Sequence, residues 1–246
     1  MIYDDIAELY DLFANTDYDV DFFCGEIEAN GTRVLELTSG TGRLSIPLIE
    51  AGADLTCVDI SQSMLAMLSD KLRERELSAR LICSDIEQMS FDSEFDLAIF
   101  PFQTFMELVG RQKQRNVLRA IYRSLANDAN FICTLHNPEL RRHSVDGILR
   151  IVGRFPKETG SLIVSGFEQG GDPVVTRRQF FEYYNESGLL EWKRLMTLEF
   201  ELIEKETFQE MAGGAGFKVA ALYGNYDRSE FDPRHSPFMI WVLETD

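Results

Sequence analysis

Basic residues are scarce in this sequence of 246 residues. Lysine and arginine total 24 against 41 aspartates and glutamates, so the formal net charge is −17 with the three histidines neutral. Proteins that bind the phosphate backbone of nucleic acids draw much of their affinity from clustered basic residues. The charge balance therefore predicts that the protein has no nucleic-acid partner.

Long hydrophobic runs are also missing. The most apolar stretch, residues 97–106, is far shorter than the roughly 20 residues that a helix needs to span a bilayer. The first residues include Asp4, Asp5 and Glu8, whereas a secretory signal begins with basic residues followed by an apolar run. We therefore expect a cytoplasmic protein with no membrane partner.

Paired cysteines are a third absence. The chain has four cysteines, which are widely spaced and form no C-x-x-C motif. Cys57, Cys83 and Cys133 lie within apolar runs, which favours buried thiols over a redox or metal-binding role. No metal site is predicted.

Short β-rich runs alternate with helical patterns between residues 32 and 138. The predicted strands are residues 33–37, 54–59, 79–83, 95–100 and 130–136, and the predicted helices are residues 42–51, 61–75 and 112–126. Such alternation is typical of a parallel sheet with helices on both faces. The sequence therefore predicts a doubly wound α/β fold.

Segments on either side of this core follow other patterns. Residues 1–30 predict two short amphipathic helices, and stretches at 161–167, 174–184 and 195–203 alternate as antiparallel strands do. A helix at 206–212, ending at Gly213-Gly214, precedes strands at 217–223 and 239–244. This last pair indicates a hairpin that closes the sheet.

The most informative segment is residues 34–45, VLELTSGTGRLS, in which a strand leads through a small-residue loop into a helix. Gly40 and Gly42 allow a ligand to approach the backbone closely. The free N–H groups at the start of the helix attract anionic groups. This pattern predicts a nucleotide-like ligand at the loop.

Acidic residues follow the first three predicted strands. Glu36 lies near the end of the first strand, Asp59 closes the second, and Asp85 follows the third. An acid at the end of the second strand is placed to accept hydrogen bonds from both ribose hydroxyls. Asp85 is suited to an adenine amine, while the adjacent Ile86 packs on the ring.

These motifs resemble those of the class I S-adenosylmethionine-dependent methyltransferases, in their small-molecule branch. The matching segments are residues 36–42, 58–65, 84–86, 95–103, 215–219, 223–227 and 236–240. The resemblance covers nearly the whole chain. It implies a doubly wound, seven-stranded Rossmann-like sheet with a closing β-hairpin, an N-terminal helical lid and an antiparallel β insertion.

The resemblance also implies a cofactor and a reaction. S-adenosylmethionine would donate a methyl group to a nitrogen, oxygen or carbon atom of a small-molecule substrate. Residues 1–138 and 205–246 would form the cofactor-binding methyltransferase domain, and residues 139–204 would form an insertion that covers the substrate. The sequence does not predict an oligomeric state.

Ten residues are predicted to bind the cofactor on this basis: Glu36, Thr38, Gly40, Gly42, Asp59, Ile60, Met64, Asp85, Ile86 and Phe100. A carboxylate at Glu36 suits the cationic amino group of the methionine part. Thr38 stands where the family's loop usually has its first glycine. It therefore either narrows the site or adds a hydroxyl contact.

His136 and Gln103 are the candidates for catalysis or substrate contact. His136 ends the fifth predicted strand, and Gln103 follows the fourth. Ligands of open α/β sheets bind beyond the carboxyl ends of such strands. His136 would contact the substrate or act as a general base, and a polar cap is the alternative. A base is needed only if the acceptor is a hydroxyl, a protonated amine or a weakly acidic carbon.

Two other functions stay open at this point. A non-catalytic cofactor-binding or interaction protein of the same fold would be compatible with the unusual Thr38. An NAD(P)-dependent oxidoreductase is suggested by Gly40, Gly42 and Ser45, which nearly satisfy the G-x-G-x-x-G/A pattern. Against this alternative, Glu36 and Thr38 interrupt the apolar strand that normally precedes the first glycine.

Overall fold

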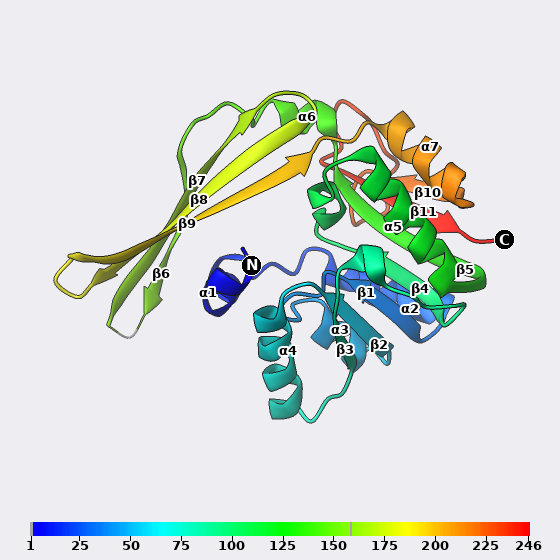
Figure 1. Cartoon of the computed structure of the whole chain (residues 1–246), viewed down its shortest axis with the longest axis horizontal. Coiled ribbons are helices and arrows are strands. Elements are labelled where there is room, and N and C mark those ends of the chain that lie inside the picture. Colours follow the sequence, from blue (N-terminus) through cyan, green and yellow to red (C-terminus); the bar gives the residue numbers. More distant parts are fainter. Residues whose placement is uncertain (1, 158) are drawn as a thin grey trace.

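The computed structural model describes residues 2–157 and 159–246 and contains two β-sheets (Figure 1). The larger sheet has the strand order β10-β11-β5-β4-β1-β2-β3. Its strands are β1 (Arg33–Leu37), β2 (Asp54–Asp59), β3 (Arg80–Cys83), β4 (Phe95–Phe100), β5 (Leu125–His136), β10 (Lys218–Tyr223) and β11 (Phe238–Glu244). The first five pair in parallel, and the last two form the antiparallel closing hairpin. The predicted doubly wound, seven-stranded sheet is therefore confirmed.

Helices cover both faces of this sheet. The described residues form the helices η1 (Asp4–Ile6), α1 (Ala7–Phe13), α2 (Val20–Asn30), α3 (Ser45–Glu50), α4 (Gln62–Glu74), η2 (Ile86–Gln88), η3 (Thr104–Glu107), α5 (Arg111–Ser124), α6 (Pro138–Arg142) and α7 (Lys205–Ala215). Successive side chains of β1 point to opposite faces of the sheet, so Val34 lies in the core on one face and Leu35 in the core on the other. Both faces of the sheet are therefore buried, as parallel sheets require.

Helix α4 shows how the sequence sets the element boundaries. The Ser61 side chain accepts a hydrogen bond from the backbone N–H of Met64 at 3.2 Å and caps the helix. Met64, Leu65, Leu68 and Leu72 follow at helical spacing and are buried. This helix begins and ends within one residue of the predicted bounds.

The smaller sheet is antiparallel, has the strand order β6-β7-β8-β9 and projects from the α/β body (Figure 1). Its strands are β6 (Arg150–Lys157), β7 (Gly160–Gly170), β8 (Val174–Asn185) and β9 (Leu190–Glu201). Leu162, Val164 and Phe181 on its inner face pack against Ile6 and Leu9 of the N-terminal helices. The N-terminal segment therefore lies between the two sheets.

Several predicted boundaries were wrong. Strand β6 was not predicted, because it lies at the sheet edge, exposes most of its residues and contains Gly153 and Pro156, which obscure any alternation. Helix α7 runs through Gly213 and Gly214 and ends where Gly216 adopts a left-handed conformation. Cys83, predicted to be buried, is exposed at the edge strand β3.

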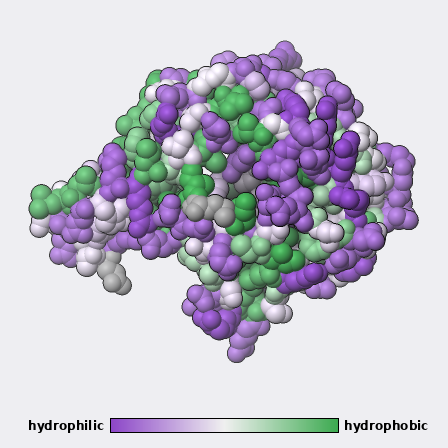
Figure 2. All heavy atoms as spheres, in the orientation of Figure 1, coloured by the Kyte–Doolittle hydropathy of each residue, from purple (hydrophilic) through white to green (hydrophobic). Residues whose placement is uncertain are grey.

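The molecular surface agrees with the acidic composition. Hydrophilic residues cover much of the face seen in Figure 2, and hydrophobic residues show at the far end of the projecting sheet. Leu189 and Leu190 at the turn between β8 and β9 are among these exposed residues. None of the described helices combines the length and the apolar character needed to cross a membrane.

Candidate active site

The ends of β1 and β2 are joined through Asp59. Its Oδ2 atom accepts a hydrogen bond from the backbone N–H of Gly40 at 2.8 Å, and its Oδ1 atom accepts one from Ser61 at 2.8 Å. The side chain is buried, and desolvation raises its pKa. Each carboxylate oxygen has two acceptor sites, so both keep a site for a ligand hydroxyl.

The two predicted glycines of the loop have different surroundings. Both residues have a positive φ angle, 56° at Gly40 and 88° at Gly42. Glycine adopts such angles readily because it has no Cβ atom. A Cβ atom added at Gly40 would meet no heavy atom within 4 Å, whereas one at Gly42 would lie 2.3 Å from Cδ1 of Leu68. Gly40 therefore leaves open space above the backbone, and Gly42 allows α4 to pack against the loop.

Glu36 is enclosed at the base of the loop. Only 1% of its surface is exposed, and it accepts a hydrogen bond from Ser45 Oγ at 2.5 Å. Burial raises the pKa of Glu36 to about 7. In this structure the carboxylate braces β1 against α3, and its contact with the cofactor stays a prediction.

Neighbouring hydroxyls take two different roles. The Oγ1 atom of Thr38 lies 2.6 Å from that of Thr104, although Thr38 has a φ of 57°, which is unusual for a β-branched residue. Thr38 thereby ties the loop to η3. The Oγ atom of Ser39 is buried and has no hydrogen-bond partner among the described residues.

The remaining predicted cofactor contacts differ in exposure. Asp85 caps η2 by accepting a hydrogen bond from the N–H of Glu87 at 3.0 Å, and the adjacent Ile86 is buried. Ile60 exposes 43% of its surface at the end of β2, where an apolar ring could pack on it. Met64 and Phe100 lie in the core, so their roles as ligand contacts stay predictions.

A cavity of about 730 Å³ lies at the carboxyl ends of β4 and β5, beneath the inner face of the smaller sheet. Tyr10, Phe13 and Tyr18 from the N-terminal segment line it, together with Gln103 and His136. The volume is typical of small-molecule sites. The structure thus brings both predicted catalytic residues to one cavity.

A hydrogen bond positions Gln103, and an aromatic stack positions His136. The Gln103 Nε2 atom donates a hydrogen bond to the Tyr226 hydroxyl at 3.3 Å. The His136 ring stacks on Phe238 with a centroid distance of 5.9 Å. Burial, together with the positive charges of Arg141 and Arg177, lowers the pKa of His136 to about 3. His136 is therefore neutral near pH 7.

Glu107 is a cavity residue that the sequence did not reveal. The Tyr3 hydroxyl lies 2.9 Å from its Oε1 atom and 3.0 Å from its Oε2 atom, and burial raises the pKa of Glu107 to about 7. Tyr3 and Glu107 are far apart in sequence, and no motif links them. The only available signal was the position of Glu107 shortly after β4.

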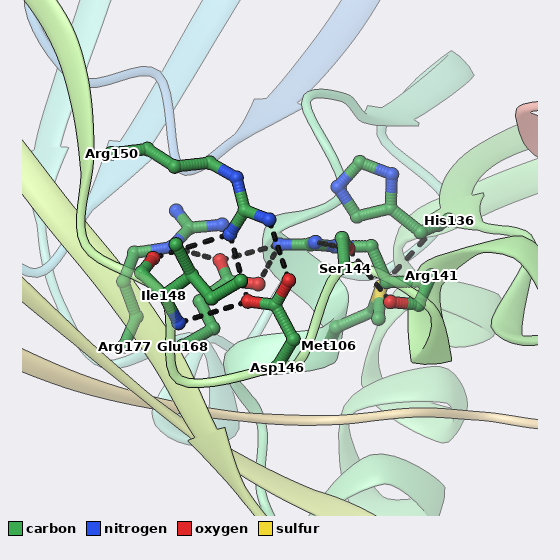
Figure 3. Close-up of polar contacts among 9 residues, drawn as sticks. All are labelled: Met106, His136, Arg141, Ser144, Asp146, Ile148, Arg150, Glu168 and Arg177. Atoms are coloured by element: carbon green, nitrogen blue, oxygen red, sulfur yellow. Dashed lines mark hydrogen bonds and ion pairs between the residues drawn. The ribbon is translucent and has the colours of Figure 1, made fainter.

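Charged residues of the insertion also reach the cavity. Arg141, Arg150, Glu168 and Arg177 line its wall (Figure 3). None of them belongs to a sequence motif, because helix α6 and strands β6, β7 and β8 bring them together from separate parts of the chain. No cluster of three or more metal-ligating side chains occurs within residues 2–157 and 159–246.

Known proteins resemble the chain in sequence and in fold. Residues 34–128 match a family model described as a methyltransferase domain. The chain is 33% identical over 222 residues to the cypemycin N-terminal methyltransferase of a Streptomyces species, which covers 87% of this chain and 84% of that relative. It is 31% identical over 136 residues to the glycine/sarcosine N-methyltransferase of Aphanothece halophytica, over 54% of this chain and 51% of that one.

A solved structure agrees in fold over the full length. An S-adenosylmethionine-dependent methyltransferase from Clostridium acetobutylicum superposes with a TM-score of 0.83 at 18% identity, covering 100% of this chain and 99% of that one. The sequence relationships confirm the predicted methyltransferase activity and cofactor, and they set aside the oxidoreductase alternative. The chain belongs to the S-adenosylmethionine-dependent methyltransferases.

Proposed function

We propose that this methyltransferase methylates an amine nitrogen of a small molecule held in the cavity between the two sheets. The observation that carries the proposal is Glu107, a buried carboxyl group whose pKa is raised to about 7 and which lines the cavity. An amine acceptor is a cation at neutral pH and must lose a proton before its lone pair can react. A carboxylate that titrates near 7 is suited to take that proton.

The loop between β1 and α3 fits the cofactor that the family uses. Gly40 leaves open space, Ser39 Oγ has no partner among the described residues, and both oxygens of Asp59 keep an acceptor site. We assign the ribose hydroxyls to Asp59 and the adenine ring to the apolar surface of Ile60 and the Asp85 region. When bound, S-adenosylmethionine supplies an electrophilic methyl group on a positively charged sulfur.

Residues of the cavity bind the substrate, take its proton and exclude water. Glu107 takes the proton, and Tyr3 holds the carboxylate in place through its hydroxyl. His136 is neutral, so it forms a hydrogen bond with the substrate amine without adding a second positive charge beside it. Tyr10, Phe13 and Tyr18 exclude water, so the protein mainly orients the acceptor for reaction.

The names of two relatives point the same way. One is named an N-terminal methyltransferase of cypemycin and the other a glycine/sarcosine N-methyltransferase. An amine nitrogen is common to these acceptors. Cytoplasmic location and the lack of a nucleic-acid partner stay predictions.

A methyl-transfer assay with labelled cofactor tests the proposal. Primary amines should accept the methyl group, whereas alcohols of matching shape should not, and the rate should rise as the pH increases through about 7 because Glu107 must be deprotonated. Glu107→Gln should lower kcat/KM by about 100-fold or more, since it removes a general base. Methylation of the alcohols alone would contradict the proposal.

Two variants separate a proton acceptor from a structural residue. Tyr3→Phe removes a hydrogen bond that lowers the pKa of Glu107, so the pH profile should move to higher pH. Glu206→Gln on the exposed surface of α7 should leave rate and profile unchanged. If Glu107→Gln keeps the wild-type rate and pH profile, Glu107 is not the base.

A further inference from the structure

Two arginines share one glutamate on the inner wall of the cavity. Glu168 of β7 lies opposite Arg177 of β8 in the sheet register, and Arg177 Nε donates a hydrogen bond to Glu168 Oε1 at 2.7 Å. Arg141, which belongs to α6, also donates to this carboxylate. Figure 3 shows the three side chains gathered together, with Arg141 lying between Glu168 and the His136 ring. We call these three residues the arginine cluster.

The arginine cluster carries a net positive charge. Two guanidinium groups surround one carboxylate, which leaves one charge uncompensated within the cluster. The other charged groups of the cavity are balanced separately: Arg150 pairs with Asp146, and the negative charge of Glu107, which is bonded to the neutral Tyr3 hydroxyl and also interacts with Arg177, is neutralised by the proton that it takes from the amine. A local excess of positive charge is therefore present in a chain whose net charge is −17.

Donor atoms of the arginine cluster are available to a ligand. Arg177 donates only through Nε, and neither of its terminal nitrogens has a hydrogen-bond partner among the described residues. The Nε atom of Arg141 also has no hydrogen-bond partner in residues 2–157 and 159–246, but it is buried, so the donors that a ligand can reach are those of Arg177. Both guanidinium groups lie 5.4 Å from the ring centroid of Phe200, which supports them from one side.

We propose that the methyl acceptor carries a carboxylate in addition to its amine, and that Arg177, supported by Arg141, binds this carboxylate. This inference rests on the proposed function, because it assumes that an amine acceptor occupies the same cavity. The guanidinium fork matches the two oxygens of a carboxylate, and such bidentate pairs are strong and directional.

The charge of the arginine cluster favours a carboxylate over a phosphate group. A single negative charge neutralises the excess, whereas a phosphate dianion would leave the wall negative inside an already acidic protein. The acceptor would then lie with its carboxylate at the smaller sheet and its amine toward Glu107 and His136. This arrangement predicts a compound of the amino-acid class.

Calorimetric binding to the S-adenosylhomocysteine-loaded protein tests the inference without requiring turnover. The probes are alanine, leucine and phenylalanine, each compared with its primary amide, which keeps the amine and loses the carboxylate. At least one amino acid should bind about tenfold or more tightly than its amide, because a charge-assisted pair is lost. Equal affinities, or no binding of any amino acid at millimolar concentration, would overturn the inference.

Matched variants connect the preference to the arginine cluster. Arg177→Gln should abolish the preference for the acid and leave binding of S-adenosylhomocysteine unchanged, while Arg177→Lys should retain part of it because the charge remains. Arg178→Gln is the control, since this neighbour lies on the opposite face of β8, over the Phe167 ring. If Arg177→Gln still binds the amino acid more tightly than the amide by the wild-type factor, the inference is also overturned.

Failure of the inference differs from failure of the proposed function. If amides and amino acids are methylated equally well, the amine assignment stands and the carboxylate site is wrong. If amino acids bind with the predicted preference but no amine is methylated, the carboxylate site stands and the proposed acceptor atom is wrong.

Discussion

Burial raises the pKa values of two glutamates to similar levels, but the two side chains face different surroundings. Glu36 and Glu107 both titrate near 7 because desolvation disfavours their charged forms. Glu36 is bound to Ser45 within the loop, whereas Glu107 lines the cavity. Only the second carboxyl group is therefore in a position to exchange a proton with a bound molecule.

Gly40 and Gly42 should respond differently to alanine. Both substitutions introduce a side chain at positive φ, which costs about 1 kcal/mol of stability. Gly42→Ala should lose a further 1–3 kcal/mol, roughly, because its Cβ atom overlaps Leu68. Gly40→Ala should instead weaken binding of S-adenosylhomocysteine by about tenfold or more, because its methyl group fills the open space above the loop.

Urea unfolding and calorimetry check this difference. The two measurements should rank the variants in opposite order, with Gly42→Ala the less stable protein and Gly40→Ala the weaker binder. Equal losses of stability would show that Leu68 yields to the added methyl group. Unchanged binding by Gly40→Ala would place the ligand elsewhere.

The sequence could predict residues in local motifs but not residues that meet across the fold. Gly40, Asp59 and Asp85 were found because strand ends and their loops are local patterns. Glu107 and Arg177 were missed because Tyr3, Glu168 and Arg141, the residues that give them their surroundings, lie far away or on separate elements. Burial, which sets the pKa of Glu36, is likewise a property of the packed structure.

At the scale of elements, α1 connects the two sheets. Its Leu9 side chain is fully buried in a cluster with Leu162, Val164 and Phe181 of the smaller sheet. The aromatic residues Tyr10 and Phe13 of the same helix line the cavity. The packing that holds the helix therefore also closes the proposed substrate site.

Leu9→Ala should loosen this connection. Removing a fully buried leucine side chain costs about 2–5 kcal/mol. Leu12→Ala is the matched control, because Leu12 lies on the same helix and is only partly buried. Thermal unfolding should show the larger loss for Leu9→Ala, and hydrogen exchange should show reduced protection of both α1 and β8. Equal losses would mean that α1 does not anchor the sheet.

The bounds of helices and strands could be predicted where apolar residues recur at regular spacing. Helix α4 has a capping serine and a clear apolar face, and its bounds were nearly correct. Strand β5 begins at Leu125, five residues before the predicted start at residue 130, because Asn127 and Asp128 are residue types typical of turns. Asp128 does adopt a φ of 57°, so the local signal was present but the strand continues through it.

The whole molecule combines an acidic surface with a positively charged wall inside its cavity. A net charge of −17 predicts that a nucleic-acid partner is absent, but it does not show the local excess of positive charge at Arg141 and Arg177. Local charge in a cavity depends on which elements meet there. The acceptor chemistry must therefore be read from the cavity, since a fold shared by many enzymes does not specify it.

Calorimetric titration with S-adenosylhomocysteine is the most direct test of the central claim, that the loop between β1 and α3 and the end of β2 hold the cofactor. The wild-type protein should bind, and Asp59→Ala should bind about 1–3 kcal/mol more weakly because acceptors for the ribose hydroxyls are lost. Asp59→Asn, which keeps the shape of the side chain, should show a smaller loss. Absence of wild-type binding at millimolar ligand, or equal affinity in Asp59→Ala, would contradict the account.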